Sequence, residues 1–195
     1  MGVTSRSPLT EFSEDGLDWG LAQALTNASP TRAAAPWAWH QPDHVVSAPT
    51  WGGCLEVVGW NLAAGRWILP TAVYAGCVLL LETSEERPGA DEVRRLLRTM
   101  GERGLLAQFP AVARARARAS DPPGPRAHLV AASDDEREAY RSDQRNAVLQ
   151  ELARYNPEAM AVFGVDFGHT SPQWVLPYGG RLTVDEPARR VIAHD

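Results

Sequence analysis

The sequence predicts an α/β fold with short buried strands, flanking helices and a closing C-terminal β-hairpin. Two continuous apolar runs, 76–82 and 160–165, are typical of strands that are buried on both faces of a sheet. Two other segments, 90–101 and 133–155, carry apolar residues at helical spacing. Strands that alternate with helices predict the α/β class.

We expect residues 1–35 to form a loop-rich N-terminal segment and residues 36–195 to form the folded domain. Ser, Thr, Pro and Ala are frequent in the first 50 residues, and few apolar positions there are periodic. A short helix is predicted over 15–25 from three leucines at helical spacing: Leu17, Leu21 and Leu25.

The middle of the chain predicts a helix, a strand and a second helix. Gly52 and Gly53 open a segment whose apolar positions fall on one helical face, and that helix should end near Gly65. The buried strand 76–82 ends in the charged Glu82. The next helix begins after Pro88-Gly89, and Gly101 is expected to terminate it.

The C-terminal third predicts a loop, a long helix and three strands. The proline-rich segment 119–132 is expected to be an exposed loop. Ser133 and Glu136 fit a capping box at the start of the long helix, which Asn156-Pro157 ends. After the strand 160–165, segments 182–184 and 190–193 are expected to pair as the hairpin.

Composition excludes several classes of protein. The chain has 195 residues, of which 44% are hydrophobic and 22% charged, with a net charge of -5. It has no secretory signal and no apolar run near the roughly 20 residues of a membrane span, so we expect a cytoplasmic protein without a membrane partner. All 19 basic residues are Arg, and the excess of acidic residues predicts no nucleic-acid partner. Two cysteines, Cys54 and Cys77, form neither a disulfide framework nor a zinc site.

Glu82 and His169 are the candidates for chemistry. Each follows a buried strand, and ligands of open α/β sheets bind at the carboxyl ends of the strands. The alternatives are structural: Glu82 as a solvated strand end or the partner of an Arg, and His169 as part of a turn.

Three longer strings resemble the C-terminal half of the LD-carboxypeptidase family of serine peptidases, and in particular its microcin C immunity branch. They are Trp51-Gly-Gly-Cys-Leu-Glu-Val-Val58, Leu79-Leu-Leu-Glu-Thr-Ser-Glu-Glu86 and Val165-Asp-Phe-Gly-His-Thr-Ser-Pro-Gln-Trp-Val-Leu-Pro-Tyr-Gly179. The resemblance runs in order from about residue 37 to the C-terminus.

This resemblance implies a Ser-Glu-His triad in which Glu82 is the acid and His169 the base. It implies hydrolysis of an amide, either in a murein L,D-tetrapeptide or in an aminoacyl-nucleotide-type inhibitor, without metal or organic cofactor. Members of the family tend to form homodimers, and their nucleophilic serine lies in a separate N-terminal domain.

That N-terminal nucleophile domain is expected to be absent from this chain and to act in cis or in trans. No serine has the Gly-x-Ser-x-Gly context of a nucleophile elbow, and Ser84 and Ser171 are close to the candidates only in sequence. Cys54 follows two glycines at a helix start, where a thiol can be reactive, but the resemblance favours a buried packing site.

Substrate-binding candidates are Trp37, Trp39, Gly52, Gly53 and Arg116. The tryptophans resemble an aromatic loop at the substrate pocket, with core packing as the alternative. The glycines either bring backbone amides to the substrate or permit a tight turn. Arg116 matches the arginine of a Gly-Arg-Pro strand end in the family, whereas a solvated stripe is the alternative for three alternating arginines: Arg114, Arg116 and Arg118.

Two functions of different classes follow. The first is the C-terminal domain of a serine hydrolase, which we expect to be inactive as the isolated chain. The second is a truncated, noncatalytic binding or interaction domain.

Overall fold

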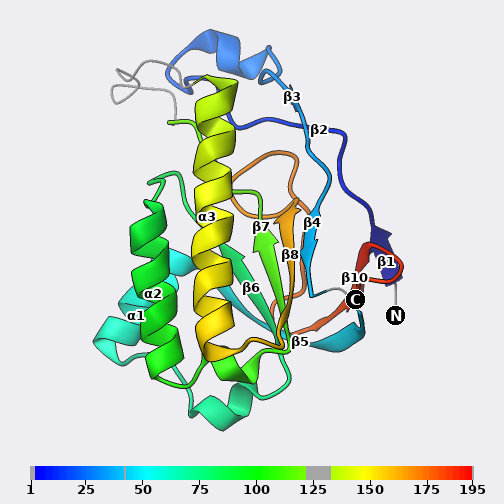
Figure 1. Cartoon of the computed structure of the whole chain (residues 1–195). Coiled ribbons are helices and arrows are strands. Elements are labelled where there is room, and N and C mark those ends of the chain that lie inside the picture. The colour runs from blue at the N-terminus through cyan, green and yellow to red at the C-terminus, as the bar shows by residue number, and fades with distance from the viewer. Residues whose placement is uncertain (1–2, 42, 122–132, 195) are drawn as a thin grey trace.

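The computed structural model describes residues 3–41, 43–121 and 133–194. Within them, eight strands form one curled mixed sheet in the order β1-β10-β9-β5-β6-β7-β8-β4 (Figure 1). The four central strands β5 to β8 run parallel, and the strands at the two sides pair antiparallel. Their bounds are β1 Val3–Arg6, β4 Ala38–His40, β5 Val45–Cys54, β6 Val78–Glu82, β7 Ala111–Ala115, β8 Met160–Val165, β9 Arg181–Asp185 and β10 Arg190–His194.

Three helices cover one face of the central strands (Figure 1): α1 Leu55–Ala64, α2 Ala90–Glu102 and α3 Asp134–Tyr155. Their apolar sides and the strands form a core that includes Leu55, Leu97, Val148 and Phe163. Short 3-10 turns at Thr71–Tyr74 and Leu106–Gln108 complete the connections on this side. None of the helices in the described ranges is both long and apolar enough to cross a membrane.

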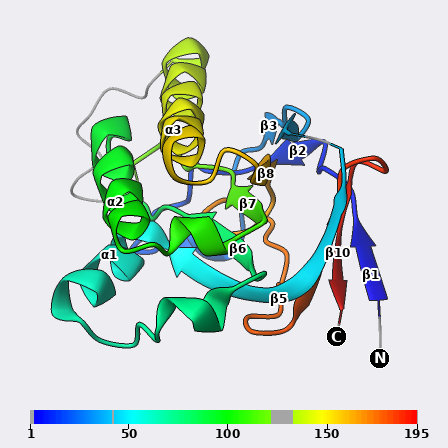
Figure 2. The same ribbon diagram turned by 60° about the horizontal axis from the view of Figure 1, so that its bottom comes forward.

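The opposite face of the sheet packs against itself because the long strand β5 bends. Its first half, Val45–Pro49, pairs with β9, and its second half, Thr50–Cys54, pairs with β6. Figure 2 shows the resulting curl, which carries β9, β10 and β1 away from the helices. A second core fills the concave side, with Leu80, Val162, Leu182 and Trp174 among its members.

The N-terminal segment contacts the rest of the domain at several places. Strand β1 pairs with β10, which puts the two ends of the chain side by side. Further along, Glu11–Phe12 (β2) pairs with Arg32–Ala33 (β3). The buried Glu14 carboxylate forms ion pairs with Arg137 and Arg141 of α3 at 2.9 and 2.6 Å. Although burial opposes ionisation, the arginine hydrogen bonds keep the pKa of Glu14 below its ordinary value.

Most local predictions are confirmed. Strands β6 and β8, helices α1, α2 and α3 and the β9–β10 hairpin lie where the apolar patterns indicated. Gly65 ends α1 with a φ of 63°, and Ser133 and Glu136 form the capping box of α3. Residues 122–132 of the expected exposed loop 119–132 lie outside the described residues, but its first residues are not exposed as predicted: Ala119 and Ser120 are buried because they hydrogen-bond to Glu14.

Three other predictions are wrong. The helix expected over 15–25 is only the 3-10 turn Ala22–Leu25, because Leu21 and Leu25 are 54% and 83% exposed and do not bury the apolar face that would stabilise a longer helix. Gly101 lies inside α2, where a Cβ would come within 2.3 Å of the Tyr155 ring. The glycines Gly52 and Gly53 belong to β5, a strand that the sequence did not predict.

Candidate active site

The carboxyl ends of the parallel strands bring the candidate residues to one edge of the sheet. Glu82 is the last residue of β6, and Arg116 directly follows β7. His169 lies in the segment that follows β8. Residues distant in sequence are therefore neighbours, as expected for parallel strands joined by helices.

Glu82 and His169 contact each other directly. His169 Nδ1 lies 2.6 Å from Glu82 Oε2, which is hydrogen-bonding distance. Glu82 is largely buried, whereas the His169 side chain is 36% exposed. This hydrogen bond is the main reason why the pKa of His169 is raised above its ordinary value, and the charge of Glu85 adds to the effect. The pair orients the imidazole through Nδ1 and leaves Nε2 for another contact.

Gly168 permits this contact. Its φ of 86° is a conformation that favours glycine, and a Cβ there would lie 2.9 Å from the Glu82 Cβ and 3.2 Å from the Ala115 Cβ. The glycine of the Gly-His pair is thus needed to seat the histidine against the strand end.

The second ring nitrogen of His169 contacts another carboxylate. His169 Nε2 lies 3.2 Å from Glu85 Oε2, and the Glu85 side chain is 48% exposed. Ser84 instead donates its hydroxyl hydrogen bond to Glu56 Oε1 at 2.7 Å. In the described part of the chain, no serine hydroxyl hydrogen-bonds to His169.

Asp166 is a buried anchor beside the histidine segment. Its carboxylate accepts hydrogen bonds from Arg116 Nη2 at 2.9 Å, from Trp37 Nε1 at 3.1 Å and from the backbone N–H of Leu9 at 3.2 Å. These contacts hold Arg116 within the protein, where its side chain is 5% exposed. Arg116 therefore fixes the start of the segment that carries His169.

The tryptophan candidates pack rather than line an open surface. Trp37 is buried and lies edge-on to Trp174, with ring centroids 5.1 Å apart. Trp39 belongs to β4, is half-buried and lies under the Arg189 guanidinium at 5.7 Å. The expected aromatic loop is thus partly a strand, and the packing interpretation describes Trp37.

The two glycines of β5 differ in their surroundings. Gly52 and Gly53 have φ values of 129° and 125°, so both adopt conformations that other residues avoid. A Cβ on Gly52 would lie 2.0 Å from the Leu80 carbonyl oxygen, whereas one on Gly53 would meet nothing within 4 Å. Neither forms the expected tight turn: Gly52 permits close strand pairing, and Gly53 leaves open space at the strand end.

The arginine stripe is buried, so the solvated-face alternative is wrong for Arg114 and Arg116, which are 3% and 5% exposed. Both line one pocket, as the alternation of a strand predicts.

Cys54 is the N-cap residue of α1, and burial is the main cause that raises the pKa of its thiol to about 11. A thiol that is protonated at neutral pH is a poor nucleophile, which supports the packing interpretation. Among the described residues, no group of three His, Cys, Asp or Glu side chains is arranged to hold a metal ion.

A sequence profile of the LD-carboxypeptidase C-terminal domain matches residues 47–184. The chain belongs to this LD-carboxypeptidase C-terminal domain family. A comparison with curated proteins finds no match. The profile covers β5 to β9 and includes both Glu82 and His169.

Solved structures share the LD-carboxypeptidase fold at low sequence identity. An MccF-like protein from Streptococcus pneumoniae in complex with AMP has a TM-score of 0.77 and 21% identity over 98% of this chain and 52% of its own. The microcin C7 self-immunity protein MccF in complex with aspartyl sulfamoyl adenosine has a TM-score of 0.73 and 15% identity over 100% of this chain and 51% of its own. An MccF-like protein from Bacillus anthracis has a TM-score of 0.67 and 12% identity over 98% of this chain and 51% of its own. The chain thus spans about half the length of these proteins.

Sequence reasoning did not assign roles to three carboxylates of this LD-carboxypeptidase domain. Glu85 contacts His169, Asp166 anchors Arg116 and Trp37, and Glu56 holds Ser84. Glu85 and Asp166 lie within the strings that carry the family resemblance, and Glu56 lies in the first of them. Their place within these strings could have marked the three acidic residues as candidates. The sequence could not give their roles, because the residues that they contact are distant along the chain.

Proposed function

We propose that this chain supplies the Glu-His half of a Ser-Glu-His hydrolase that cleaves an amide bond. The observation that carries the proposal is the 2.6 Å contact between His169 Nδ1 and Glu82 Oε2, which leaves Nε2 as the nitrogen that can accept a proton. The serine would come from an N-terminal nucleophile domain, in cis or in trans. That the related solved chains are about twice as long supports this arrangement.

In this mechanism each group has a separate task. His169 accepts the serine proton through Nε2 while the serine oxygen attacks the amide carbonyl, and it then donates the proton to the leaving amine. Glu82 holds the proton of Nδ1, fixes the tautomer and stabilises the imidazolium that forms. Water then hydrolyses the acyl-serine with His169 again acting as the base.

Glu85 contacts His169 Nε2, which is the same nitrogen that must accept the serine proton. Its carboxylate lies 3.2 Å from Nε2, so the docked serine would have to displace it. Because Glu85 is exposed, its side chain is free to rotate into solvent. The raised pKa of His169 means that the base becomes available only as the pH rises through that pKa.

The substrate class is either a murein L,D-tetrapeptide or an aminoacyl-nucleotide-type compound in the cytoplasm. Support for the second comes from the similar proteins, which were solved with AMP and with aspartyl sulfamoyl adenosine. The resemblance of the chain to the LD-carboxypeptidase family supports the first.

The experiment is reconstitution of amidase activity with a nucleophile domain. The chain alone should release no product from aspartyl sulfamoyl adenosine or from murein tetrapeptide, and addition or fusion of the nucleophile domain should restore turnover. His169→Ala or Glu82→Gln should then reduce kcat/KM by about 10³-fold or more.

Matched controls separate catalysis from folding. His44→Ala and Glu158→Gln remove the same groups just before β5 and β8 begin, at the opposite ends of these strands from the catalytic pair, and should leave kcat/KM unchanged. Turnover that survives His169→Ala would refute the assigned base. A reconstituted protein without turnover on either substrate would instead favour the noncatalytic binding domain.

A further inference from the structure

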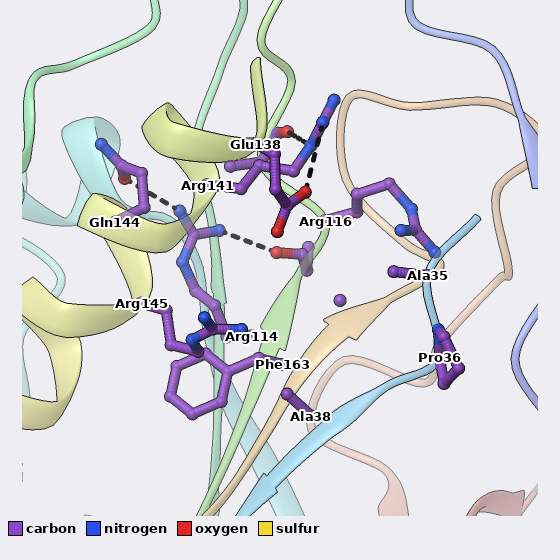
Figure 3. Close-up of a pocket in the computed structure, with 13 residues that line it drawn as sticks. Ala35, Pro36, Ala38, Arg114, Arg116, Glu138, Arg141, Gln144, Arg145 and Phe163 are labelled. Carbon is purple, nitrogen blue, oxygen red and sulfur yellow. Dashed lines mark hydrogen bonds and ion pairs between the residues drawn. The ribbon is translucent and has the colours of Figure 1, made fainter. Parts of the chain in front are cut away.

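A small pocket lies above the carboxyl ends of β7 and β8, under the first half of α3 (Figure 3). Its volume is about 70 Å³, which is room for a ligand of a few heavy atoms. Neither Glu82 nor His169 lines it; Ala115, which lines the pocket, separates it from the histidine segment. Four arginines surround the space: Arg114, Arg116, Arg141 and Arg145.

Two of these arginines are neutralised by buried carboxylates. Arg116 pairs with Asp166 at 2.9 Å, and Arg141 pairs with Glu14 at 2.6 Å. Arg116 nevertheless keeps one buried N–H, at Nε, without an acceptor among the described residues. Arg116 can therefore still donate one hydrogen bond, although its charge is paired with Asp166.

Arg114 has only neutral hydrogen-bond acceptors in the described part of the chain. Its guanidinium donates to Ala115 O at 3.2 Å, Thr83 Oγ1 at 3.1 Å and Gln144 Oε1 at 3.3 Å. The side chain is 3% exposed, and burial lowers its pKa, although an arginine stays charged in a protein. Buried charges are normally paired, because an unpaired ion in a protein interior is costly.

More distant carboxylates do not supply the missing contact. Glu82 and Glu56 act on Arg114 through space, but their own oxygens bond to His169 and Ser84. Arg145 also has no ion pair within the described ranges, and it donates a long hydrogen bond to Ser142 Oγ at 3.5 Å. Two guanidinium groups thus face one pocket without a carboxylate partner.

The remaining walls are mostly apolar. Figure 3 shows Ala38 and Phe163 below the arginines and Pro36 to one side. Glu138 is the acidic residue of the lining; it extends from α3 toward Arg141 at 4.0 Å and its side chain is 62% exposed. The pocket combines an excess of buried donors with a short apolar surface.

We propose that this pocket binds a small organic carboxylate, with its oxygens on Arg114 and Arg145 and its short alkyl tail against Phe163 and Ala38. Guanidinium groups match the geometry of a carboxylate and form charge-assisted hydrogen bonds with it. The site is separate from the proposed catalytic pair, and the proposal does not depend on amidase activity.

The test is a titration of the full chain with butyrate, followed by NMR at constant ionic strength. Butyrate should bind saturably and shift the signals of Ala38 and Phe163, whereas butyramide, which has the same shape without the charge, should not bind. Arg145→Gln should weaken butyrate binding by about tenfold or more, the loss expected for one charge-assisted contact. Arg95→Gln, on an exposed position of α2, should leave it unchanged.

Three results would overturn the proposal. They are equal binding of butyrate and butyramide, saturable binding of inorganic phosphate in place of butyrate, and unchanged butyrate affinity in Arg145→Gln. Arg114→Met should also abolish binding, but it removes a buried guanidinium with three hydrogen bonds and so lowers the stability of the fold as well. The half-buried Arg145 therefore provides the decisive variant.

Discussion

Substitution of the two adjacent glycines of β5 by alanine should have unequal effects on stability. Gly52 and Gly53 have nearly the same φ, 129° and 125°, so an alanine at either position meets a similar backbone strain. Backbone conformations that only glycine adopts readily cost about 1–3 kcal/mol for another residue. Gly53→Ala should therefore reduce the free energy of unfolding by about that amount, because a Cβ there meets nothing within 4 Å.

Gly52→Ala should cost more because its Cβ would lie 2.0 Å from the Leu80 carbonyl oxygen. Gly52 is paired with Leu80 in the parallel ladder, and backbone cannot rotate away as a flexible side chain does. Overpacking costs about 1–3 kcal/mol, and a disrupted ladder hydrogen bond adds about 0.5–1.5 kcal/mol. We expect Gly52→Ala to be about 1.5–4.5 kcal/mol less stable than Gly53→Ala.

Urea unfolding of the wild-type chain and both variants, monitored by tryptophan fluorescence, measures this difference. The slope of the free energy against urea should be similar in the three proteins, so that the midpoints report stability. Equal midpoints for the two variants would refute the argument that close strand pairing is what requires Gly52.

Two further predictions concern titration at the strand ends. A histidine NMR titration should give His169 a pKa above its ordinary value, and Glu85→Gln should lower it because one of two facing carboxylates loses its charge. The protonated imidazole should stabilise the folded protein fully at a pH below the pKa of His169 in the unfolded chain, and this stabilisation should be lost as the pH rises through the pKa of His169 in the folded protein. An unchanged His169 pKa in Glu85→Gln would contradict the Glu85 contact. In a Cys77→Ser variant, alkylation of Cys54 by iodoacetamide should increase with pH up to about 11, and rapid alkylation at pH 7 would contradict the raised pKa of this thiol.

The elements that the sequence predicted correctly have patterns contained within each segment. The run 76–82 is apolar throughout because β6 is covered on both faces, and α3 begins at a capping box whose two residues are three positions apart. Helix α2 places Val93, Leu97 and Met100 toward the core at helical spacing. Such patterns are readable because the interacting residues are close in sequence.

Strand β5 was missed because its pattern depends on partners elsewhere. Its first half contacts β9 and its second half β6, so one strand lies in two environments and does not show one alternation. Gly52, Gly53 and Pro49 are unfavourable for strands in isolation, yet here they permit the bend and the close approach to Leu80.

The sequence by itself determined the fold class, the family and the two residues Glu82 and His169 as candidates. Only the tertiary structure decided that they touch, that Glu85 contacts the second imidazole nitrogen, and that Arg114 is buried without a carboxylate partner in the described residues. The physical reason is that hydrogen bonds and charge pairs depend on distances of about 3 Å between side chains. Parallel strands joined by helices set those distances between residues that are far apart along the chain.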